Sequence, residues 1–143
     1  MPNKISERLL EIVDALPLKD GLRVLEIGCG PGVAAREIAN RFNNIYVLAI
    51  DRSLKAIEQA KTNSKREIGS GKLRFVRSEI EEFELPENEE PFDIAFAVRV
   101  GALDGRHPKI EKQSLTQIAK ALKKNGKLFI DGGSPLTEIE LRK

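Results

Sequence analysis

The sequence predicts an α/β fold: a three-layer, doubly wound, mostly parallel sheet of about five strands, with helices on both faces. Two observations carry this prediction. Short apolar runs, of the kind that is buried on both faces of a parallel sheet, alternate along the chain with segments whose apolar residues recur at helical spacing. The first apolar run also ends in a glycine-rich turn that leads into a helical segment, as in the strand–helix units of such sheets.

Five apolar runs have the length and the boundaries of buried strands. They are four to seven residues long, which is short for a helix that covers a sheet. The predicted strands are residues 22–27, 45–50, 73–76, 92–98 and 127–131. Crossover connections between parallel strands are expected to be right-handed.

The helices are predicted from apolar spacing and from residues that favour helix ends. A first amphipathic helix is expected over residues 4–16. Pro31 is expected to open the second helix, because a first-turn residue needs no N–H. Ser53 is expected to cap the third helix, and the last helix is expected to close at Asn125-Gly126, before the fifth strand.

The length and composition are those of one soluble globular domain. The 143 residues suffice for one hydrophobic core, and 41% of them are hydrophobic. We expect a single domain over residues 1–143, with an N-terminal helical segment (1–20), a core that carries the site (21–132) and a short tail (133–143).

Charge and residue types argue against several classes of partner and site. With 24 basic and 22 acidic residues the net charge is +2, so neither nucleic acid nor a membrane is expected as a partner. The polar N-terminus and the lack of a long apolar run predict a cytoplasmic protein. The chain has one cysteine, Cys29, and one histidine, His107, so neither a disulfide nor a metal site is expected.

Residues 24–34, VLEIGCGPGVA, contain three alternating glycines. Gly28, Gly30 and Gly32 lack a Cβ, so the backbone there can turn tightly and approach a ligand closely. The helix that follows offers free N–H groups and a partial positive charge to an anionic group. A nucleoside triphosphate fits poorly, because no Gly-Lys-Ser/Thr sequence follows. The fingerprint for a dinucleotide is weakened, since Val33 replaces its third small residue.

Further features follow this loop in order along the chain. Glu26 precedes the glycines and completes the pattern E-x-G-x-G-x-G. The other features are Asp51 after the second strand, Ser78-Glu79 after the third, Phe92-Asp93 in the fourth, and ALKKNGKL (residues 121–128) before the fifth. With these features over residues 4–132, the sequence resembles the class I (Rossmann-like) S-adenosylmethionine-dependent methyltransferases, in particular those that act on small molecules.

The resemblance implies which residues hold S-adenosylmethionine. Glu26 would face the ammonium group of the cofactor, and the glycines would lie against its methionine part. Asp51 would accept hydrogen bonds from the ribose hydroxyls, beside a capping role at the next helix. Glu79 would accept from the adenine amino group, although a solvated acidic loop is the alternative there. The implied cofactor residues are Glu26, Gly28, Cys29, Gly30, Gly32, Asp51, Arg52, Ser78, Glu79 and Ile80.

Members of this family place the transferred methyl group near the loop after the fourth strand, here residues 99–108. His107 is the candidate general base, because its ordinary pKa lies near neutrality. An exposed histidine held by Pro108 is the alternative. Arg99 and Arg106 are candidates to hold an anionic acceptor, and Arg99 is favoured because it directly follows the strand.

The sequence departs from the family after the fifth strand. Members usually have seven strands that end in an antiparallel hairpin, whereas eleven residues follow Gly132 here. The hairpin is therefore expected to be missing or reduced, with residues 137–141 forming one more strand or a short helix. The edge of the fifth strand is expected to be covered by this tail or by a second chain, in a homodimer or with another partner.

The sequence thus predicts methyl transfer from S-adenosylmethionine to a small-molecule acceptor. Two alternatives stay open. One is a non-catalytic cofactor-binding module or subunit of a complex, which the shortened C-terminus favours. The other is an NAD(P)-dependent oxidoreductase, in which Arg52 would suit a 2′-phosphate.

Overall fold

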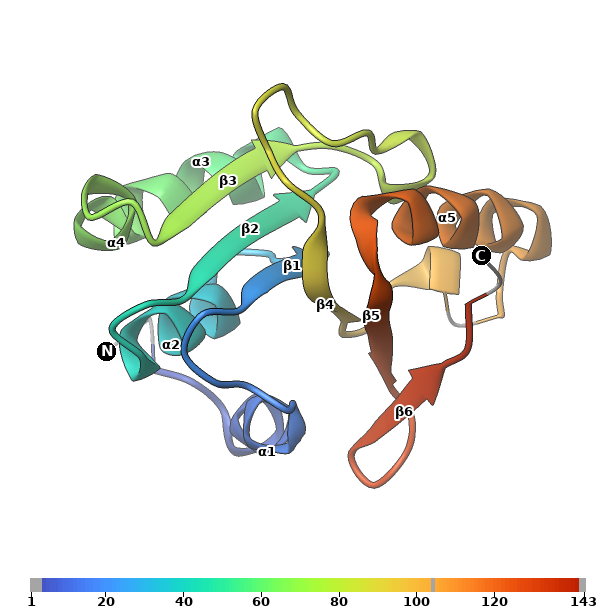
Figure 1. Cartoon of the computed structure of the whole chain (residues 1–143), viewed down its shortest axis with the longest axis horizontal. Helices are drawn as coiled ribbons and strands as arrows, with labels where there is room; N and C mark the ends of the chain where they lie inside the picture. Colours follow the sequence, from blue (N-terminus) through green and yellow to red (C-terminus); the bar gives the residue numbers. More distant parts are fainter. Residues whose placement is uncertain (1–3, 104, 142–143) are drawn as a thin grey trace.

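The computed structural model describes residues 4–103 and 105–141, which contain a six-stranded sheet with helices on both faces (Figure 1). The strands are β1 (Arg23–Ile27), β2 (Tyr46–Asp51), β3 (Leu73–Arg77), β4 (Phe92–Ala97), β5 (Leu122–Asp131) and β6 (Leu136–Ile139). The helices are α1 (Glu7–Ala15), α2 (Val33–Arg41), α3 (Leu54–Asn63), α4 (Lys65–Gly69) and α5 (Pro108–Ala121), with short 3₁₀ turns η1 (Ile80–Glu82) and η2 (Gly101–Leu103). The predicted α/β class is confirmed.

The strand order creates a crevice in the middle of the sheet. The order is β3-β2-β1-β4-β5-β6. The five strands from β1 to β5 run parallel to one another, and only the last pair, β5 and β6, is antiparallel. The chain builds the sheet outward from β1 to β3 and then returns to the other side of β1 with β4. Ligands of open α/β sheets bind at the carboxyl ends of the strands beside such a reversal.

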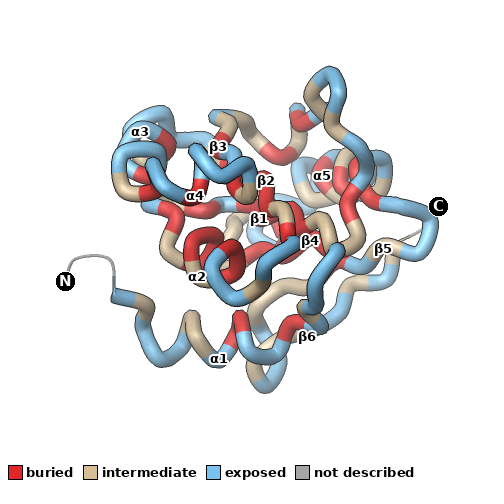
Figure 2. The backbone as a smooth tube through the Cα atoms, turned by 60° about the vertical axis from the view of Figure 1, so that its left-hand side comes forward, coloured by how far each residue is buried: buried red, intermediate tan, exposed pale blue. Residues whose placement is uncertain are grey.

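A hydrophobic core covers each face of the sheet. One face packs against α1, α2 and α3, and it buries Val13, Ile38 and Ile57. The other face packs against η1 and α5, and it buries Ile80 and Ile118. Figure 2 shows the buried backbone gathered in the central strands. Burial on both faces explains why these strands are apolar along nearly their whole length.

The turn between β1 and α2 differs from the prediction at its proline. Gly32, with a φ of 86°, is the N-cap of α2, so Pro31 precedes the helix instead of opening it. A Cβ on Gly32 would lie 2.7 Å from the ring of Phe75. The chain needs a left-handed residue between the loop and the first helical turn, and only glycine fits under that ring.

The end of α5 also differs from the prediction. The helix was expected to close at Asn125-Gly126, but it ends before Leu122, where β5 begins. Leu122 is 5% exposed and pairs with Phe92 of β4, and the residues after it bulge out of the sheet. Burial of Leu122 and pairing with β4 therefore outweigh the local preference for a helix end at Asn-Gly.

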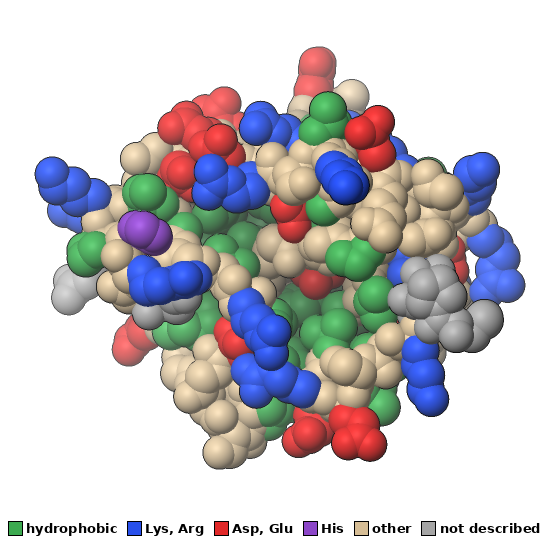
Figure 3. Space-filling view, turned by 180° about the vertical axis from the view of Figure 1, so that it is seen from behind, with side chains coloured by type: hydrophobic (Ala, Val, Ile, Leu, Met, Phe, Trp, Pro, Cys, Tyr) green, Lys and Arg blue, Asp and Glu red, His purple; other side chains and the backbone are tan. Residues whose placement is uncertain are grey.

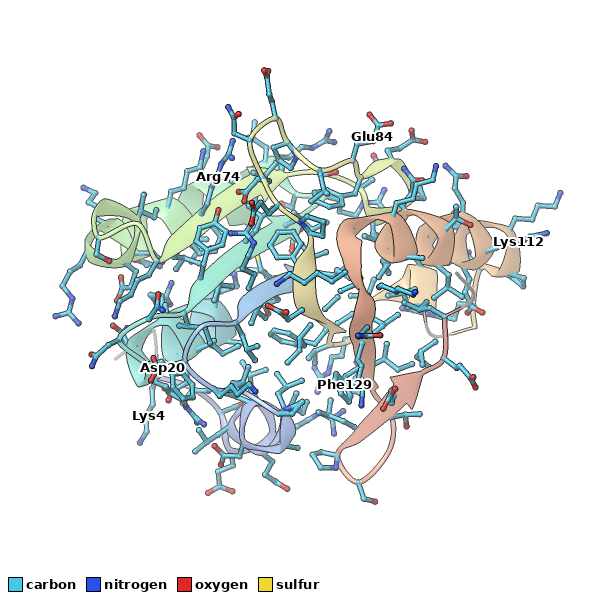
Figure 4. All side chains as sticks on the ribbon, viewed as in Figure 1. Lys4, Asp20, Arg74, Glu84, Lys112 and Phe129 are labelled. Carbon is cyan, nitrogen blue, oxygen red and sulfur yellow. The ribbon has the colours of Figure 1, made fainter. Side chains whose placement is uncertain are left out.

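The C-terminal tail forms a strand, so of the two predicted conformations the helix is wrong. β6 pairs with residues 128–131 of β5 and raises the strand number from about five to six. The two strands form one antiparallel hairpin, so the terminal hairpin that was expected to be missing or reduced is present as a single short pair. The edge of the fifth strand was expected to be covered by the tail or by a second chain, and in the structure the tail covers it. Phe129, which lies on β5 (Figure 4), packs against the core on the α1 side.

Candidate functional site

A cavity of about 510 Å³ opens at the carboxyl ends of β1 to β4, beside the reversal of strand order. This volume is typical of a small-molecule pocket. Figure 3 shows a hollow with hydrophobic side chains in its floor, and with arginine or lysine side chains and the single histidine around it. The cavity is lined by Ile27, Gly28, Ile50, Asp51, Arg52, Ser78, Glu79, Ile80, Glu81, Arg99, Val100, Gly101, Ala102, Arg106, His107 and Ile110.

Asp51, the last residue of β2, is held by backbone groups at both carboxylate oxygens. Its Oδ2 accepts a hydrogen bond from the N–H of Gly30 at 2.8 Å, and its Oδ1 accepts one from the N–H of Ser53 at 2.9 Å. Ser53 is the N-cap of α3, as predicted, because its Oγ accepts from the N–H of Ala56. Each Asp51 oxygen keeps a further acceptor site, so a fixed carboxylate faces the cavity.

The glycine loop passes close to the cavity at Gly28. The N–H of Gly28 donates to the carbonyl of Ile50 at 2.8 Å, which fixes the loop to the end of β2. A Cβ on Gly28 would lie 2.7 Å from the side chain of Val100, in the loop after β4. The missing Cβ therefore lets the side chain of Val100 pack directly against the glycine loop. Gly30 and Gly32 do not line the cavity, and their part is to shape the turn.

Glu26 is a buried carboxyl group in the middle of the sheet. It is 4% exposed, and its Oε1 has no hydrogen-bond partner among the described residues. Burial raises the pKa of Glu26 to about 8, and the nearby charge of Asp51 adds to the rise. The N–H of Ala35 and the charge of Arg36 act in the opposite direction. A cation or a hydrogen-bond donor beside the free oxygen would stabilise the ionised form of Glu26.

Arg36 holds the glycine loop through a hydrogen bond to its main chain, a role that the sequence did not predict. It lies on α2, is 9% exposed, and donates from Nη1 to the carbonyl of Pro31 at 2.8 Å and to Ser64 Oγ at 2.9 Å. Burial lowers the pKa of Arg36, and the charges of Glu67 and Glu26 oppose that change. An arginine within the apolar face of α2 was the signal that could have revealed this residue.

The segment after β3 forms the wall of the cavity next to Asp51. The N–H of Ser78 donates to the carbonyl of Asp51 at 3.0 Å. Arg77 donates from Nε to the carbonyl of Arg52 at 2.9 Å, and its Nη2 lies 3.8 Å from Glu79 Oε1. These contacts bring the ends of β2 and β3 together. Beyond η1, Glu84 is exposed and points away from the molecule (Figure 4), whereas the Glu89 side chain is 8% exposed and its Oε1 accepts a hydrogen bond from Arg23 Nη2 at 2.6 Å.

The loop after β4 carries the predicted acceptor-side residues. Arg99 has a φ of 56°, and its N–H donates to Asp131 Oδ1 at 3.0 Å. Asp131 Oδ2 accepts from Arg8 Nη2 of α1, also at 3.0 Å. His107 is exposed and is the N-cap of α5, where its side chain makes no capping hydrogen bond.

The structure brings most of the predicted site residues together around one cavity. The cavity lining includes the predicted residues Gly28, Asp51, Arg52, Ser78, Glu79, Ile80, Arg99, Arg106 and His107, but it does not include Glu26, Cys29, Gly30 or Gly32. Cys29 is 6% exposed, and burial raises the pKa of its thiol. The lining residues that the sequence did not predict are mainly apolar, such as Ile27, Ile50 and Val100. Their position at or just after the ends of strands could have indicated them.

The described residues contain no group of three or more His, Cys, Asp or Glu side chains that could hold a metal ion. In that same part of the chain, no helix has both the length and the apolar composition needed to cross a membrane.

Comparison with known families gives one match over most of the chain. A family model described as a methyltransferase domain matches residues 18–141. A sterol 24-C-methyltransferase of Gibberella zeae is 31% identical over 76% of this chain and 27% of its own length. An O-methyltransferase of Aspergillus nomiae is 29% identical over 96% of this chain and 60% of its own length. The chain thus spans roughly a quarter to three fifths of these relatives.

Solved structures show the same fold. A methyltransferase from Thiobacillus denitrificans, in complex with S-adenosylhomocysteine, is 25% identical with a TM-score of 0.68, over 90% of this chain and 48% of the other. The cyclase SpnF is 27% identical with a TM-score of 0.69, over 86% of this chain and 43% of the other.

Proposed function

The chain belongs to the methyltransferase domain family, and we propose that it binds S-adenosylmethionine and transfers the methyl group to a small-molecule acceptor. The observation that carries this proposal is the carboxylate of Asp51, held by two backbone N–H groups at the reversal of strand order. A fixed group with only acceptor sites suits a pair of ribose hydroxyls. The similarity to an enzyme in complex with S-adenosylhomocysteine supports the same ligand.

The methionine end of the cofactor would lie over the glycine loop. Gly28, Gly30 and Gly32 supply its left-handed turns, and Cys29 lies buried between the first two. Glu26 suits the ammonium group, directly or through water, because its buried Oε1 lacks a partner among the described residues. The positive end of α2 suits the carboxylate of the same amino acid.

The adenine end would lie between the segments after β2 and β3. Ile80 offers an apolar contact, while Glu79 and the backbone of Ser78 offer polar ones. Arg52 lines this end, and its carbonyl is already held by Arg77. We therefore assign residues 21–132 as the cofactor-binding unit, with the tail after them closing the sheet edge.

When bound, S-adenosylmethionine supplies an activated methyl group: an acceptor lone pair bonds to the methyl carbon while the carbon–sulfur bond breaks and sulfur leaves as a neutral thioether. The residues of this chain contribute chiefly alignment at the cavity. An acceptor that carries a proton of high pKa also needs a base, and His107, which lines the cavity, is the candidate whose Nδ1 or Nε2 would take that proton. Arg99 would orient the acceptor from the loop after β4.

Binding without methyl transfer is the second candidate function. It stays open because fold likeness alone does not determine chemistry: the similar structure of SpnF is that of a cyclase. A nicotinamide cofactor is the third, and the Val33 that replaces the small residue of its fingerprint argues against it.

Calorimetric titration of the purified chain tests the proposal, with S-adenosylmethionine and S-adenosylhomocysteine as ligands and with NAD and NADP as controls. We expect the adenosyl pair to bind and the nicotinamide pair not to bind. Binding of NAD or NADP alone, or of none of the four to the folded protein, would overturn the proposed cofactor. Incubation with methyl-labelled cofactor and a panel of small acceptors then separates transfer from binding.

A further inference from the structure

The charges around the cavity are divided between its two sides. Carboxylates come from the β2 and β3 side, as Asp51, Glu79 and Glu81. The residues that come from the connection between β4 and α5 include Arg99, Arg106 and His107. Arg52 is the basic residue on the acidic side. On the side of the cavity beside β4, the charged side chains among the described lining residues are therefore basic.

Arg99 occupies a backbone conformation that L residues rarely adopt. Its φ is 56°, and the structure holds it there through the hydrogen bond from its N–H to Asp131. The Asp131 side chain is 16% exposed and is held in turn by Arg8. An unusual backbone conformation kept in place by a chain of contacts is a sign of function. Here it carries an exposed arginine to the cavity wall.

The guanidinium of Arg99 makes no hydrogen bond or ion pair with the described residues, whereas its main chain is fixed. Arg106 also lines the cavity, and its guanidinium packs so closely on Gly101 that a Cβ there would lie 2.9 Å from it. A planar guanidinium binds a carboxylate or a phosphate through two parallel hydrogen bonds. It gives a neutral ligand no comparable advantage.

We propose that the methyl acceptor carries a carboxylate or phosphate group, and that Arg99 binds this group in the basic half of the cavity, with Arg106 and His107 beside it. This assignment rests on the proposed function, because it places the cofactor over β1 and β2 and the acceptor beside β4. Arg99 would therefore determine the specificity of the cavity for anionic acceptors. Acceptors that lack the anionic group would bind the same cavity more weakly.

The single histidine allows a direct test by NMR, since its imidazole gives one set of signals. The chain is first saturated with S-adenosylhomocysteine, with binding measured by calorimetry. Benzoate, phenyl phosphate and benzamide are then titrated separately while the His107 signals are followed. We expect benzoate or phenyl phosphate to bind at least tenfold more tightly than benzamide, and the stronger of the two identifies the anionic group.

Variants assign the effect to Arg99. Arg99→Gln should reduce the preference for the anion at least tenfold, and Arg99→Lys should retain part of it. Lys112→Gln is the matched control, because Lys112 lies on α5, does not line the cavity and points away from the molecule (Figure 4). It removes one positive charge and should leave the preference unchanged.

The outcomes separate this inference from the function it rests on. Failure of S-adenosylhomocysteine to bind overturns the proposed function. If it binds but benzamide binds as well as the two anions, or none of the three binds, the anionic acceptor is wrong and the cofactor assignment stands. An anion preference that survives in Arg99→Gln overturns the assignment to Arg99.

Discussion

Asp51 combines a structural and a proposed binding role in one carboxylate. The two hydrogen bonds from Gly30 and Ser53 tie the glycine loop and the start of α3 to the end of β2. The same bonds fix both oxygens toward the cavity. Loss of this side chain should therefore affect the loop and the ligand together.

Asp51→Ala is expected to weaken the binding of S-adenosylhomocysteine at least tenfold, or about 1.4 kcal/mol, because charge-assisted hydrogen bonds are lost. It should also lower the free energy of unfolding by about 1–3 kcal/mol. Calorimetry and urea unfolding measure the two effects. Glu58→Ala, which removes an exposed carboxylate from α3, is the control. Unchanged affinity in a folded Asp51→Ala variant would exclude Asp51 from the site.

Glu26 should make the stability of the free protein depend on pH. Burial in the folded state raises the pKa of Glu26 from its usual 4.5 to about 8. As pH rises through this interval, the unfolded state loses the proton while the folded state keeps it, so folding becomes less favourable. The free energy of unfolding should fall between about pH 5 and pH 8, by on the order of a few kcal/mol.

Urea unfolding of the wild type and of Glu26→Gln across this pH range measures that contribution. The neutral glutamine has no proton to lose, so its curve should be flatter than that of the wild type. S-adenosylhomocysteine should also flatten the wild-type curve, because its ammonium group would stabilise ionised Glu26. Parallel curves for the two proteins would show that Glu26 does not titrate in this range.

At the scale of elements, the hairpin of β5 and β6 decides how the sheet ends. Without β6, the outer side of β5 would present unpaired N–H and C=O groups. β6 pairs with Leu128, Phe129 and Ile130, and so moves the open edge outward by one strand. The tail is thus part of the sheet.

Hydrogen exchange tests this pairing in solution. The amides of Leu128, Phe129 and Ile130 are expected to exchange slowly, because β5 lies between β4 and β6. The outward-facing amides of β6 should exchange faster and serve as an internal reference. Exchange of the three β5 amides at the rate of an unstructured peptide would mean that the hairpin opens.

Local patterns predicted the type and order of the first five strands well, but they misplaced two boundaries. Pro31 favours a helix start, yet Gly32 had to fit under Phe75 before α2 could begin. Asn125-Gly126 favours a helix end, yet pairing of Leu122 with β4 ended α5 earlier. In both places a contact distant in sequence outweighed the local preference.

At the scale of the whole molecule, α1 and the loop after β4 are joined through Asp131. Arg8 and Asp131 lie 123 positions apart in the sequence, and Arg99 and Asp131 lie 32 apart. No spacing rule connects these residues. These two hydrogen bonds to Asp131 hold the loop after β4, which forms the basic side of the cavity, against α1 and β5.

A ligand that binds only the folded state should stabilise the whole molecule. S-adenosylhomocysteine at one hundred times its Kd should add about 2.7 kcal/mol and raise the Tm by roughly 5–10 °C. Thermal unfolding followed by circular dichroism measures the shift, with NAD at equal concentration as the control. An unchanged Tm at saturating ligand would contradict the proposed site.

The sequence by itself determined the α/β class and the positions of the first five strands along the chain, because these follow from periodicity within single strand–helix units, whereas the residues expected at the cavity were implied by the resemblance to a methyltransferase family. Only the tertiary structure decided that the tail is a strand, that Glu26 is buried without a partner for one oxygen among the described residues, and that Asp131 holds Arg99. Each of these depends on burial or on pairing with other segments of the chain, and local sequence patterns do not decide such contacts.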